Sequence, residues 1–181
     1  MSTASAIAVA VSETTAAQPT FTQVAEDHLG STYRYLIHLV ANRDLAEDLT
    51  SATFERALKD WHRFDPQKGT PEVWLIQIAR RVALDHFRSE GRRRGREETY
   101  AAREPRVAEP PAEPGGDTQL RRAIAGLTRS ERELLALRVV LELDSKETAE
   151  VVGGTPSAVS SGLHRALGKL RREMGNRDEQ A

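Results

Sequence analysis

The chain has 181 residues and a formal net charge of −1, with 39% hydrophobic, 29% charged and 5% aromatic residues. This composition is typical of a soluble protein with one domain or two small ones. It excludes polyanion binding by the chain as a whole, so such binding has to come from local patches. Cysteine is absent, which excludes disulfides and cysteine nucleophiles. No apolar run approaches the roughly 20 residues that cross a membrane, so we expect no membrane insertion.

The chain begins with a stretch that is rich in Ala, Ser and Thr, and we expect residues 1–20 to form a disordered tail. Its short apolar run, AIAVAV, has no basic residue before it, which argues against a signal peptide. Apolar residues then recur with helical spacing from about Phe21 to Ala41. This spacing predicts a first helix with Leu29 on its core side.

Two further helices are predicted in this N-terminal unit, which we expect to span residues 21–94. Asp44 is expected to cap the second helix, with Glu47 three residues later as its capping-box partner. The segment HRFDPQKG is predicted to be a loop because it contains Asp-Pro and Gly. Thr70 is expected to cap the third helix, with Pro71 at its first helical position.

Charge changes sign abruptly after the third helix. Residues 80–96 contain seven arginines and two acids, a local net charge of +5. Residues 97–118 contain six acids and two arginines, a local net charge of −4, together with several prolines and glycines. Such a composition cannot bury enough apolar area to fold alone. It predicts a flexible, acidic, Pro-rich linker over residues 95–118.

A second unit is predicted over residues 119–174, followed by a short tail over 175–181. Residues that favour helix starts follow one another closely in this unit. The segments TRSE and DSKE are both capping boxes, and a Gly-Gly pair separates the last two predicted helices. A short helix, a Gly-containing turn and a helix with a basic end form the outline of a helix-turn-helix. The starts are Leu120, Thr128, Asp144 and Thr155.

Three segments together resemble the extracytoplasmic-function (ECF) class of bacterial RNA polymerase sigma factors, in the sigma-70 family. These segments are YRYLIHLVANRDLAEDLTSATFERAL, RFDPQKGTPEVWLIQIARRVALDHFR and LTRSERELLALRVVLELDSKETAEVV with the following AVSSGLHRALGKLR. The resemblance implies an all-α fold of two small helical domains joined by the linker. It also implies core RNA polymerase, promoter DNA and an anti-sigma factor as partners, with no enzymatic activity, metal or cofactor.

By this resemblance, residues 21–94 are sigma region 2, whose second helix contacts the core polymerase. The chain's own residues agree, because that helix combines acidic and apolar side chains. An alternative stays open, in which the acids are helix caps and a solvated face. The candidate polymerase-binding residues are Asp44, Glu47, Asp48, Leu49, Phe54 and Glu55.

The same resemblance places binding of the start-proximal (−10) element on the loop and the third helix. A base flipped out of the promoter needs polar edges and a flat surface, which Phe64, Asp65 and Lys68 supply. Arginine side chains grip phosphate with their planar forks. The alternatives are that Phe64 only anchors the loop and that the basic run is a solvated helix end. The candidate arginines are Arg80, Arg81, Arg88, Arg92, Arg93 and Arg94.

Residues 119–174 resemble sigma region 4, which binds the upstream (−35) element through its last helix. Here the chain departs from the family, because Ser160 and Gly162 occupy positions where relatives commonly carry basic residues. Gly within a helix also costs about 1 kcal/mol relative to Ala. The candidate DNA-binding residues are Thr155, Ser157, Ser160, Ser161, His164, Arg165, Lys169 and Arg171.

Two other classes of function remain as alternatives. A two-domain helix-turn-helix regulator would bind DNA without polymerase, and a helical adaptor would use only the acidic face. An enzyme is not favoured, because the five histidines are scattered and no nucleotide-binding loop is present. Binding to core RNA polymerase separates the sigma factor from both alternatives.

Overall fold

The computed structural model describes residues 19–97 and 118–175. Within these segments the chain forms helices joined by turns and irregular stretches, and it forms no strands. The all-α prediction is confirmed. None of the helices in these two segments has the length and apolar character to span a membrane. The elements are α1 (Phe21–Val40), α2 (Arg43–Asp60), the 3-10 turn η1 (Trp61–Arg63), α3 (Pro71–Glu97), α4 (Thr118–Ala125), α5 (Arg129–Leu135), the π-helix η2 (Ala136–Val140), α6 (Ser145–Val152) and α7 (Pro156–Gly175).

Side-chain caps explain where most helices start. The hydroxyl of Thr128 accepts a hydrogen bond from the backbone N–H of Glu131, and the Asp144 carboxylate does the same for Glu147, so both predicted capping boxes are confirmed. Thr70 caps α3 as predicted. The prediction for α2 was wrong, because Asn42 is its cap and Asp44 lies in the first turn.

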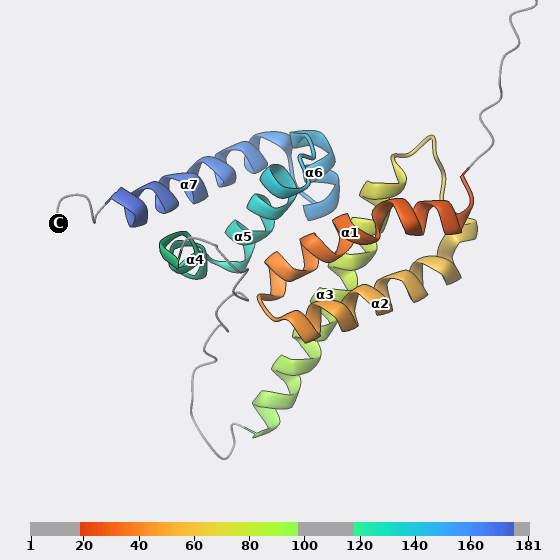
Figure 1. The fold of residues 1–181 in the computed structure, drawn as a ribbon, viewed down its shortest axis with the longest axis horizontal. Helices are drawn as coiled ribbons and strands as arrows, with labels where there is room; N and C mark the ends of the chain where they lie inside the picture. The colour runs from red at the N-terminus through yellow and green to blue at the C-terminus, as the bar shows by residue number, and fades with distance from the viewer. Residues whose placement is uncertain (1–18, 98–117, 176–181) are drawn as a thin grey trace, which may run out of the picture.

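Helices α1, α2 and α3 form the N-terminal unit by packing against one another (Figure 1). Their apolar faces enclose a cluster around Val24, Ala57, Leu75 and Ile78. Helix α3 continues to Glu97, past the predicted boundary at residue 94. Most of the predicted linker and most of both predicted tails lie outside the described residues, although Thr20 caps α1 and Gly175 ends α7.

Helices α4 to α7 form the C-terminal unit, in which α7 packs against α4, α5 and α6. Gly153 ends α6 in the left-handed conformation, with φ of 76°, which glycine adopts at little cost. Helix α7 follows after a short turn, so the predicted helix-turn-helix is present as α6 and α7. The π-helix η2 was not predicted, and π-helical turns are uncommon outside functional or strained segments.

The two units share one apolar core, which the expectation of two separate domains did not include. Tyr35 and Leu36 from α1 and Ile76 from α3 belong to the same cluster as Leu137 and Val151 from the C-terminal unit, and all five are buried. Figure 1 shows α5 and α6 lying toward α1 and α3, between the outer helices of the two units. The described residues therefore form one body with two helical units.

Candidate nucleic-acid and polymerase interfaces

An acidic face runs along α2. Asp44, Asp48 and Glu55 are exposed, and their spacings of four and seven residues place them on one side of the helix. Glu47 lies beside this face and pairs with Arg43 at 3.0 Å. This arrangement presents several negative charges to a partner without fixing most of them in ion pairs.

The apolar members of the predicted polymerase contact are not equally accessible. Leu49 is only 5% exposed and belongs to the core, which corrects the expectation that its side chain is part of the contact surface. Phe54 is half-buried against the cluster of the N-terminal unit. Leu49 therefore supports α2 from below, and Phe54 is the apolar residue that still reaches the surface.

An apolar groove between α1 and α2 was not foreseen. It has a volume of about 350 Å³. Leu29, which was expected on the core side, is 53% exposed and lines this groove. A helical period alone does not tell which apolar residues at the edge of a helix face are covered by a neighbouring helix. The lining residues are Phe21, Ala25, Glu26, Leu29, Thr50, Ser51 and Phe54.

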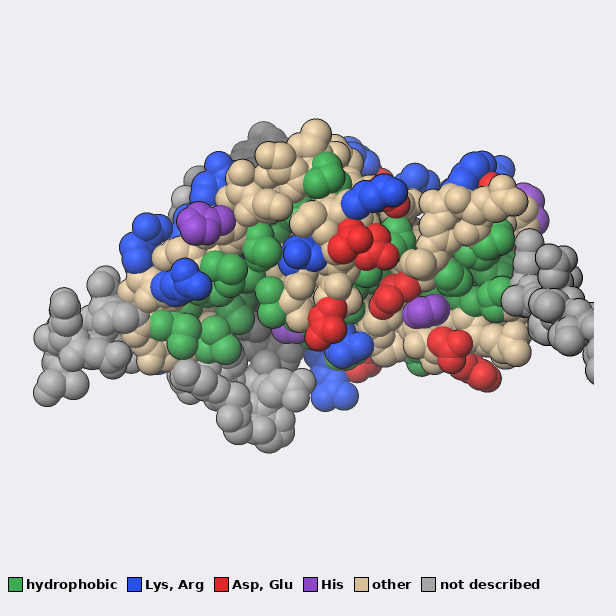
Figure 2. All heavy atoms as spheres, turned by 90° about the horizontal axis from the view of Figure 1, so that it is seen from above, with side chains coloured by type: hydrophobic (Ala, Val, Ile, Leu, Met, Phe, Trp, Pro, Cys, Tyr) green, Lys and Arg blue, Asp and Glu red, His purple; other side chains and the backbone are tan. Residues whose placement is uncertain are grey.

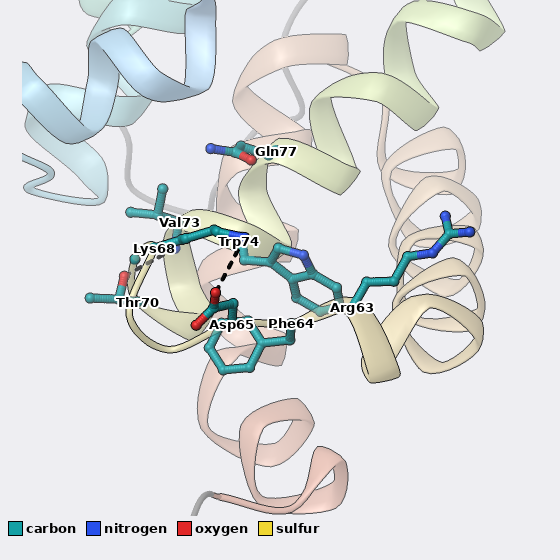
Figure 3. A pocket seen from close by; sticks show the side chains of 9 residues that line it. Arg63, Phe64, Asp65, Lys68, Thr70, Val73, Trp74 and Gln77 are labelled. Atoms are coloured by element: carbon teal, nitrogen blue, oxygen red, sulfur yellow. Dashed lines mark hydrogen bonds and ion pairs between the residues drawn. The ribbon is translucent and has the colours of Figure 1, made fainter.

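The loop between η1 and α3 forms a pocket of about 170 Å³, and it brings the predicted base-binding residues Phe64, Asp65 and Lys68 together (Figure 3). Phe64 stacks on Trp61 with ring centroids 5.0 Å apart, and it lies 5.4 Å from Trp74. Phe64 therefore anchors the loop to the neighbouring tryptophans and also forms part of the pocket wall. The pocket offers an aromatic surface next to polar groups, which suits a nucleobase.

Polar contacts hold the loop in shape. The carboxylate of Asp65 accepts a hydrogen bond from the backbone N–H of Gln67 at 3.0 Å and pairs with Lys68 at 3.2 Å. The hydrogen bond from Gln67, followed by the one from Lys68, lowers the pKa of Asp65. Asp65 is therefore ionised at neutral pH, and it orients the ammonium group of Lys68 at the pocket.

Three of the arginines on α3 form a stripe along the helix. Arg81, Arg88 and Arg92 are exposed, and spacings of seven and four residues place them along one stripe of the helix. Arg88 pairs with Asp85 at 3.0 Å, and Arg93 pairs with Glu90 at 3.2 Å. The side chain of Arg94 lies outside the described residues.

Arg80 differs from the other arginines. It lies off the stripe, and its Nε donates a hydrogen bond of 2.7 Å to Glu133 in the C-terminal unit. The side chain of Arg80 is 25% exposed. Arg80 was predicted to bind DNA, and in this structure it joins the two units instead of facing solvent with Arg81.

The exposed face of α7 carries the predicted upstream-element residues. Ser157, Ser161, His164 and Arg171 are exposed and recur at helical spacing, so they form one polar stripe. Thr155 caps the helix through the backbone N–H of Ala158, and Ser160 donates to the Pro156 carbonyl. Arg165 is exposed at the edge of this stripe. Figure 2 shows basic side chains gathered toward the end of the molecule where α7 lies.

Lys169 lies apart from the polar stripe of α7. Its ammonium group contacts the carboxylate of Glu131 on α5 at 2.6 Å. This hydrogen bond, followed by the bond with the Thr128 backbone, lowers the pKa of Glu131 to about 2. Lys169 therefore fastens α7 to α5, a role that its spacing in the sequence did not reveal.

Gly162 has a packing role. It is buried, and a β-carbon at this position would lie 2.5 Å from Cδ1 of Leu134 on α5. Gly162 therefore lies where α7 packs closely against α5. Glycine permits this approach because it has no side chain.

No group of three or more His, Asp or Glu side chains suited to a metal ion occurs within residues 19–97 and 118–175. These segments present an acidic helix face, an aromatic pocket and two polar or basic helix stripes.

Comparison with known proteins identifies the family. Residues 24–93 match the model of sigma-70 region 2, and residues 117–170 match the model of sigma-70 region 4. The chain is 32% identical over 165 residues to the RNA polymerase sigma factor CarQ of Myxococcus xanthus, covering 88% of this chain and 91% of CarQ. It is 31% identical over 160 residues to the ECF RNA polymerase sigma factor BldN of Streptomyces coelicolor, covering 84% of this chain but only 59% of BldN.

Two solved structures show the same fold. The sigma factor RpoE of Bartonella quintana, in complex with the anti-sigma factor NepR, superposes with a TM-score of 0.73 at 23% identity, covering 86% of this chain and 96% of that one. CnrH, in complex with the cytosolic domain of CnrY, superposes with a TM-score of 0.62 at 24% identity, covering 86% and 88%. The two region models match in order, CarQ matches over nearly its whole length, and BldN is an ECF sigma factor. The chain therefore belongs to the ECF group of the sigma-70 family, whose members are transcription initiation factors and not enzymes.

Proposed function

We propose that this chain binds core RNA polymerase and directs it to the promoters of a specific regulon in the cytoplasm. The observation that carries the proposal is that one unit combines an exposed acidic helix face with an aromatic pocket and an arginine stripe. The acidic face supplies a protein contact, and the other two features supply contacts to bases and phosphates. A regulator that binds DNA alone has no use for the first of these surfaces.

Polymerase binding is assigned to the exposed face of α2. Its acids, Asp44, Asp48 and Glu55, form a stripe whose charge complements a basic partner surface. The apolar groove beside it exposes Leu29 and part of Phe54. Protein interfaces usually have an apolar centre and a polar rim, and the groove and the acids beside it have this combination.

Promoter binding is assigned to both units. The stripe of Arg81, Arg88 and Arg92 on α3 is suited to phosphates, and the pocket around Phe64 and Lys68 is suited to a base that has left the stack during promoter melting. The polar stripe of α7 is proposed to bind the upstream element in the major groove. Its hydroxyl groups and His164 supply hydrogen bonds but little charge, so this contact is expected to be the weaker of the two.

A partner that inhibits the chain is part of the proposal. The solved structures with the same fold are of a sigma factor bound to an anti-sigma factor and of CnrH bound to the cytosolic domain of CnrY. The exposed groove between α1 and α2 is a surface that such a partner could cover. Polymerase and an inhibitor would then compete for one face of the N-terminal unit.

Core binding by charge-reversal variants tests the assignment. Asp48→Arg places a cation in the middle of the acidic face, so we expect the affinity for core RNA polymerase to fall by at least about tenfold. Glu150→Arg makes the same charge change at an exposed position of α6 and serves as the control. Equal core affinity of wild type and Asp48→Arg, with unchanged helicity by circular dichroism, would contradict the proposal.

A further inference from the structure

An aromatic cluster joins the groove between α1 and α2 to the pocket formed by the loop before α3. Its members are Phe21, Trp61, Phe64 and Trp74, four of the chain's nine Phe, Trp and Tyr residues. The rings of Phe21 and Trp61 meet edge to face with centroids 5.6 Å apart, and Trp61 meets Trp74 in the same way at 5.6 Å. A chain that is poor in aromatic residues thus concentrates them where the groove and the pocket approach each other.

Phe21 belongs to the wall of the groove and to this cluster at once. It is the first residue of α1, and it lines the groove. A capping box fixes the backbone here, because the Thr20 hydroxyl accepts a hydrogen bond from the backbone N–H of Gln23 at 3.3 Å and the Gln23 side chain accepts one from the backbone N–H of Thr20 at 2.9 Å. The ring of Phe21 is half-buried, so it contacts Trp61 and is also open to a molecule that occupies the groove.

Trp61 and Phe64 extend the contact to the pocket. Their rings are nearly parallel, at 11°, with centroids 5.0 Å apart. The backbone N–H of Phe64 also donates a hydrogen bond of 3.0 Å to the Trp61 carbonyl, which closes the turn η1. The two residues are therefore joined through backbone and side chains, and a displacement of Trp61 is passed to Phe64. Phe64 and Trp74 line the pocket beside Lys68 (Figure 3), so such a displacement reaches the surface assigned to the base.

Ring contacts of this kind are directional. Aromatic side chains prefer edge-to-face and offset stacked arrangements, because the ring faces are negative and the ring edges are positive. An aliphatic side chain of similar size fills the space of a ring but imposes no such orientation on its neighbours. In a closely packed cluster, we therefore expect the loss of one ring to turn the adjacent rings.

We propose that Phe21 is a positioning residue for the base pocket, since its ring orients Trp61 and, through Trp61, the wall of the pocket that Phe64 forms. Because the same ring lines the groove, a partner that binds there also changes the pocket. The orienting contact belongs to the free chain, and only its effect on a melted base rests on the proposed function. Phe21 thereby acts on DNA recognition from α1, although the pocket is built from the loop and α3.

Tryptophan spectroscopy of the full free chain tests the orienting contact. Trp61 and Trp74 are the two tryptophans of the chain, so tryptophan emission and near-ultraviolet circular dichroism both report on the cluster. Phe21→Leu removes the ring, and Phe21→Tyr keeps it. Phe87→Leu is the matched control, because Phe87 is also half-buried but packs against the core that the two units share.

The contact predicts a red-shifted tryptophan emission and a weaker near-ultraviolet tryptophan signal for Phe21→Leu. Phe21→Tyr and Phe87→Leu should both retain the wild-type tryptophan signals. Unchanged signals in a folded Phe21→Leu chain overturn the proposal that this ring orients its neighbours.

A label in the groove tests whether its occupant affects the pocket. The chain has no cysteine, so Leu29→Cys provides a unique site in the groove wall for N-phenylmaleimide, which adds an apolar ring there. Leu58→Cys is the control, because Leu58 is exposed to a similar extent, at 60% against 53% for Leu29, and lies toward the other end of α2 from the groove-lining Thr50. Labelling of Leu29→Cys should shift the tryptophan emission, and labelling of Leu58→Cys should not.

The same labelling in a Phe21→Leu background assigns the shift to Phe21, because the shift should then disappear. A shift that persists without the ring overturns the role of Phe21. Unchanged emission in the labelled Leu29→Cys chain overturns the link between groove and pocket, and this measurement decides the matter if Phe21→Leu loses helicity.

Promoter opening by the assembled holoenzyme tests the consequence for DNA. Each variant is mixed with saturating core polymerase, so that differences in core affinity do not enter. The rate of opening is measured by permanganate reactivity of unpaired thymines on one promoter recovered from a run-off transcription library. Phe21→Leu should slow opening by about two- to tenfold, as expected for the loss of one aromatic contact. Phe21→Tyr should restore the wild-type rate, and Phe87→Leu should retain it.

The spectra and the opening rates separate the two parts of the proposal. Altered tryptophan signals with an unchanged opening rate in Phe21→Leu overturn the role at the pocket. Failure of every holoenzyme, wild type included, to open the promoter contradicts the proposed function, while the spectra still decide whether Phe21 orients the cluster.

Discussion

Gly162 shows how a single residue in α7 is governed by packing. A β-carbon at this position meets Leu134 at 2.5 Å, whereas one at Gly168 on the same helix meets nothing within 4 Å. Replacing Gly by Ala in a helix gains about 1 kcal/mol in propensity, and overpacking costs about 1–3 kcal/mol. Gly168→Ala should therefore raise the free energy of unfolding by about 0.5–1 kcal/mol, and Gly162→Ala should lower it.

Urea denaturation of the two variants provides the measurement. The opposite signs are the result that matters, because both variants make the same chemical change in one helix. Stabilisation of the protein by Gly162→Ala would show that Leu134 moves aside without cost and that close packing does not explain this glycine.

The ion pair of Lys169 with Glu131 makes stability depend on pH. The pKa of Glu131 is lowered to about 2 in the folded chain, below its ordinary value. Its stabilising contribution is therefore complete above its ordinary pKa and is lost as the pH falls toward 2. Because Lys169 is 42% exposed, solvent screening reduces this contribution to about 1 kcal/mol.

Glu131→Gln removes this pH dependence while retaining an acceptor for the Thr128 cap. We expect the variant to be about 1 kcal/mol less stable than wild type at pH 7 and equally stable near pH 2. Unfolding free energies at a series of pH values test this expectation. A difference that stays constant over the whole series would show that the charge of Glu131 contributes nothing.

Residue positions were predictable where they depend on local sequence and not where they depend on a neighbouring helix. Phe64, Asp65 and Lys68 were predicted to act together, and one short loop brings them to one pocket. Leu49 was predicted at a contact surface and is buried, because its exposure is decided by other helices. The same reason explains why the partner of Arg80 was not foreseen.

Helix α3 carries part of its positive charge on one stripe, formed by Arg81, Arg88 and Arg92. Removing one cation that binds a phosphate should reduce the slope of log affinity against log salt by about 0.9 for duplex DNA. We expect this reduction in the holoenzyme–promoter complex for alanine variants of Arg81, Arg88 and Arg92. All three belong to the basic stretch of residues 80–96, and helical spacing places them on one stripe.

Promoter affinity measured at several salt concentrations distinguishes the two explanations of this run. Lys59→Ala on α2 removes one exposed cation outside the stripe and should leave the slope unchanged. Slopes equal to wild type in all three arginine variants would return the run to a solvated helix end.

Helix positions were largely predictable because capping is local. Thr128, Asp144 and Thr70 each bond a backbone N–H within their own first turn, so their sequence neighbours are sufficient. Asn42 and Asp44 both have side chains suited to a cap, and their sequence does not decide between them. The π-helix at Ala136–Val140 was unpredictable for a different reason, since it forms where the chain packs against the other unit.

At the scale of the whole molecule, composition correctly separated two helical units but did not reveal their common core. Contacts such as Tyr35 with Glu133 join residues that lie 98 positions apart. Periodicity marks an apolar face without naming its partner. Tyr35 and Leu137 were therefore assignable to helices from the sequence, and their meeting required the structure.

We expect this chain to make core RNA polymerase specific for promoters. Run-off transcription with purified core polymerase on a promoter library measures this specificity. Specific transcripts should appear only when the chain is added, and they should be lost with Asp48→Arg. Specific DNA binding by the free chain, without any transcript in the presence of core polymerase, would instead favour a helix-turn-helix regulator.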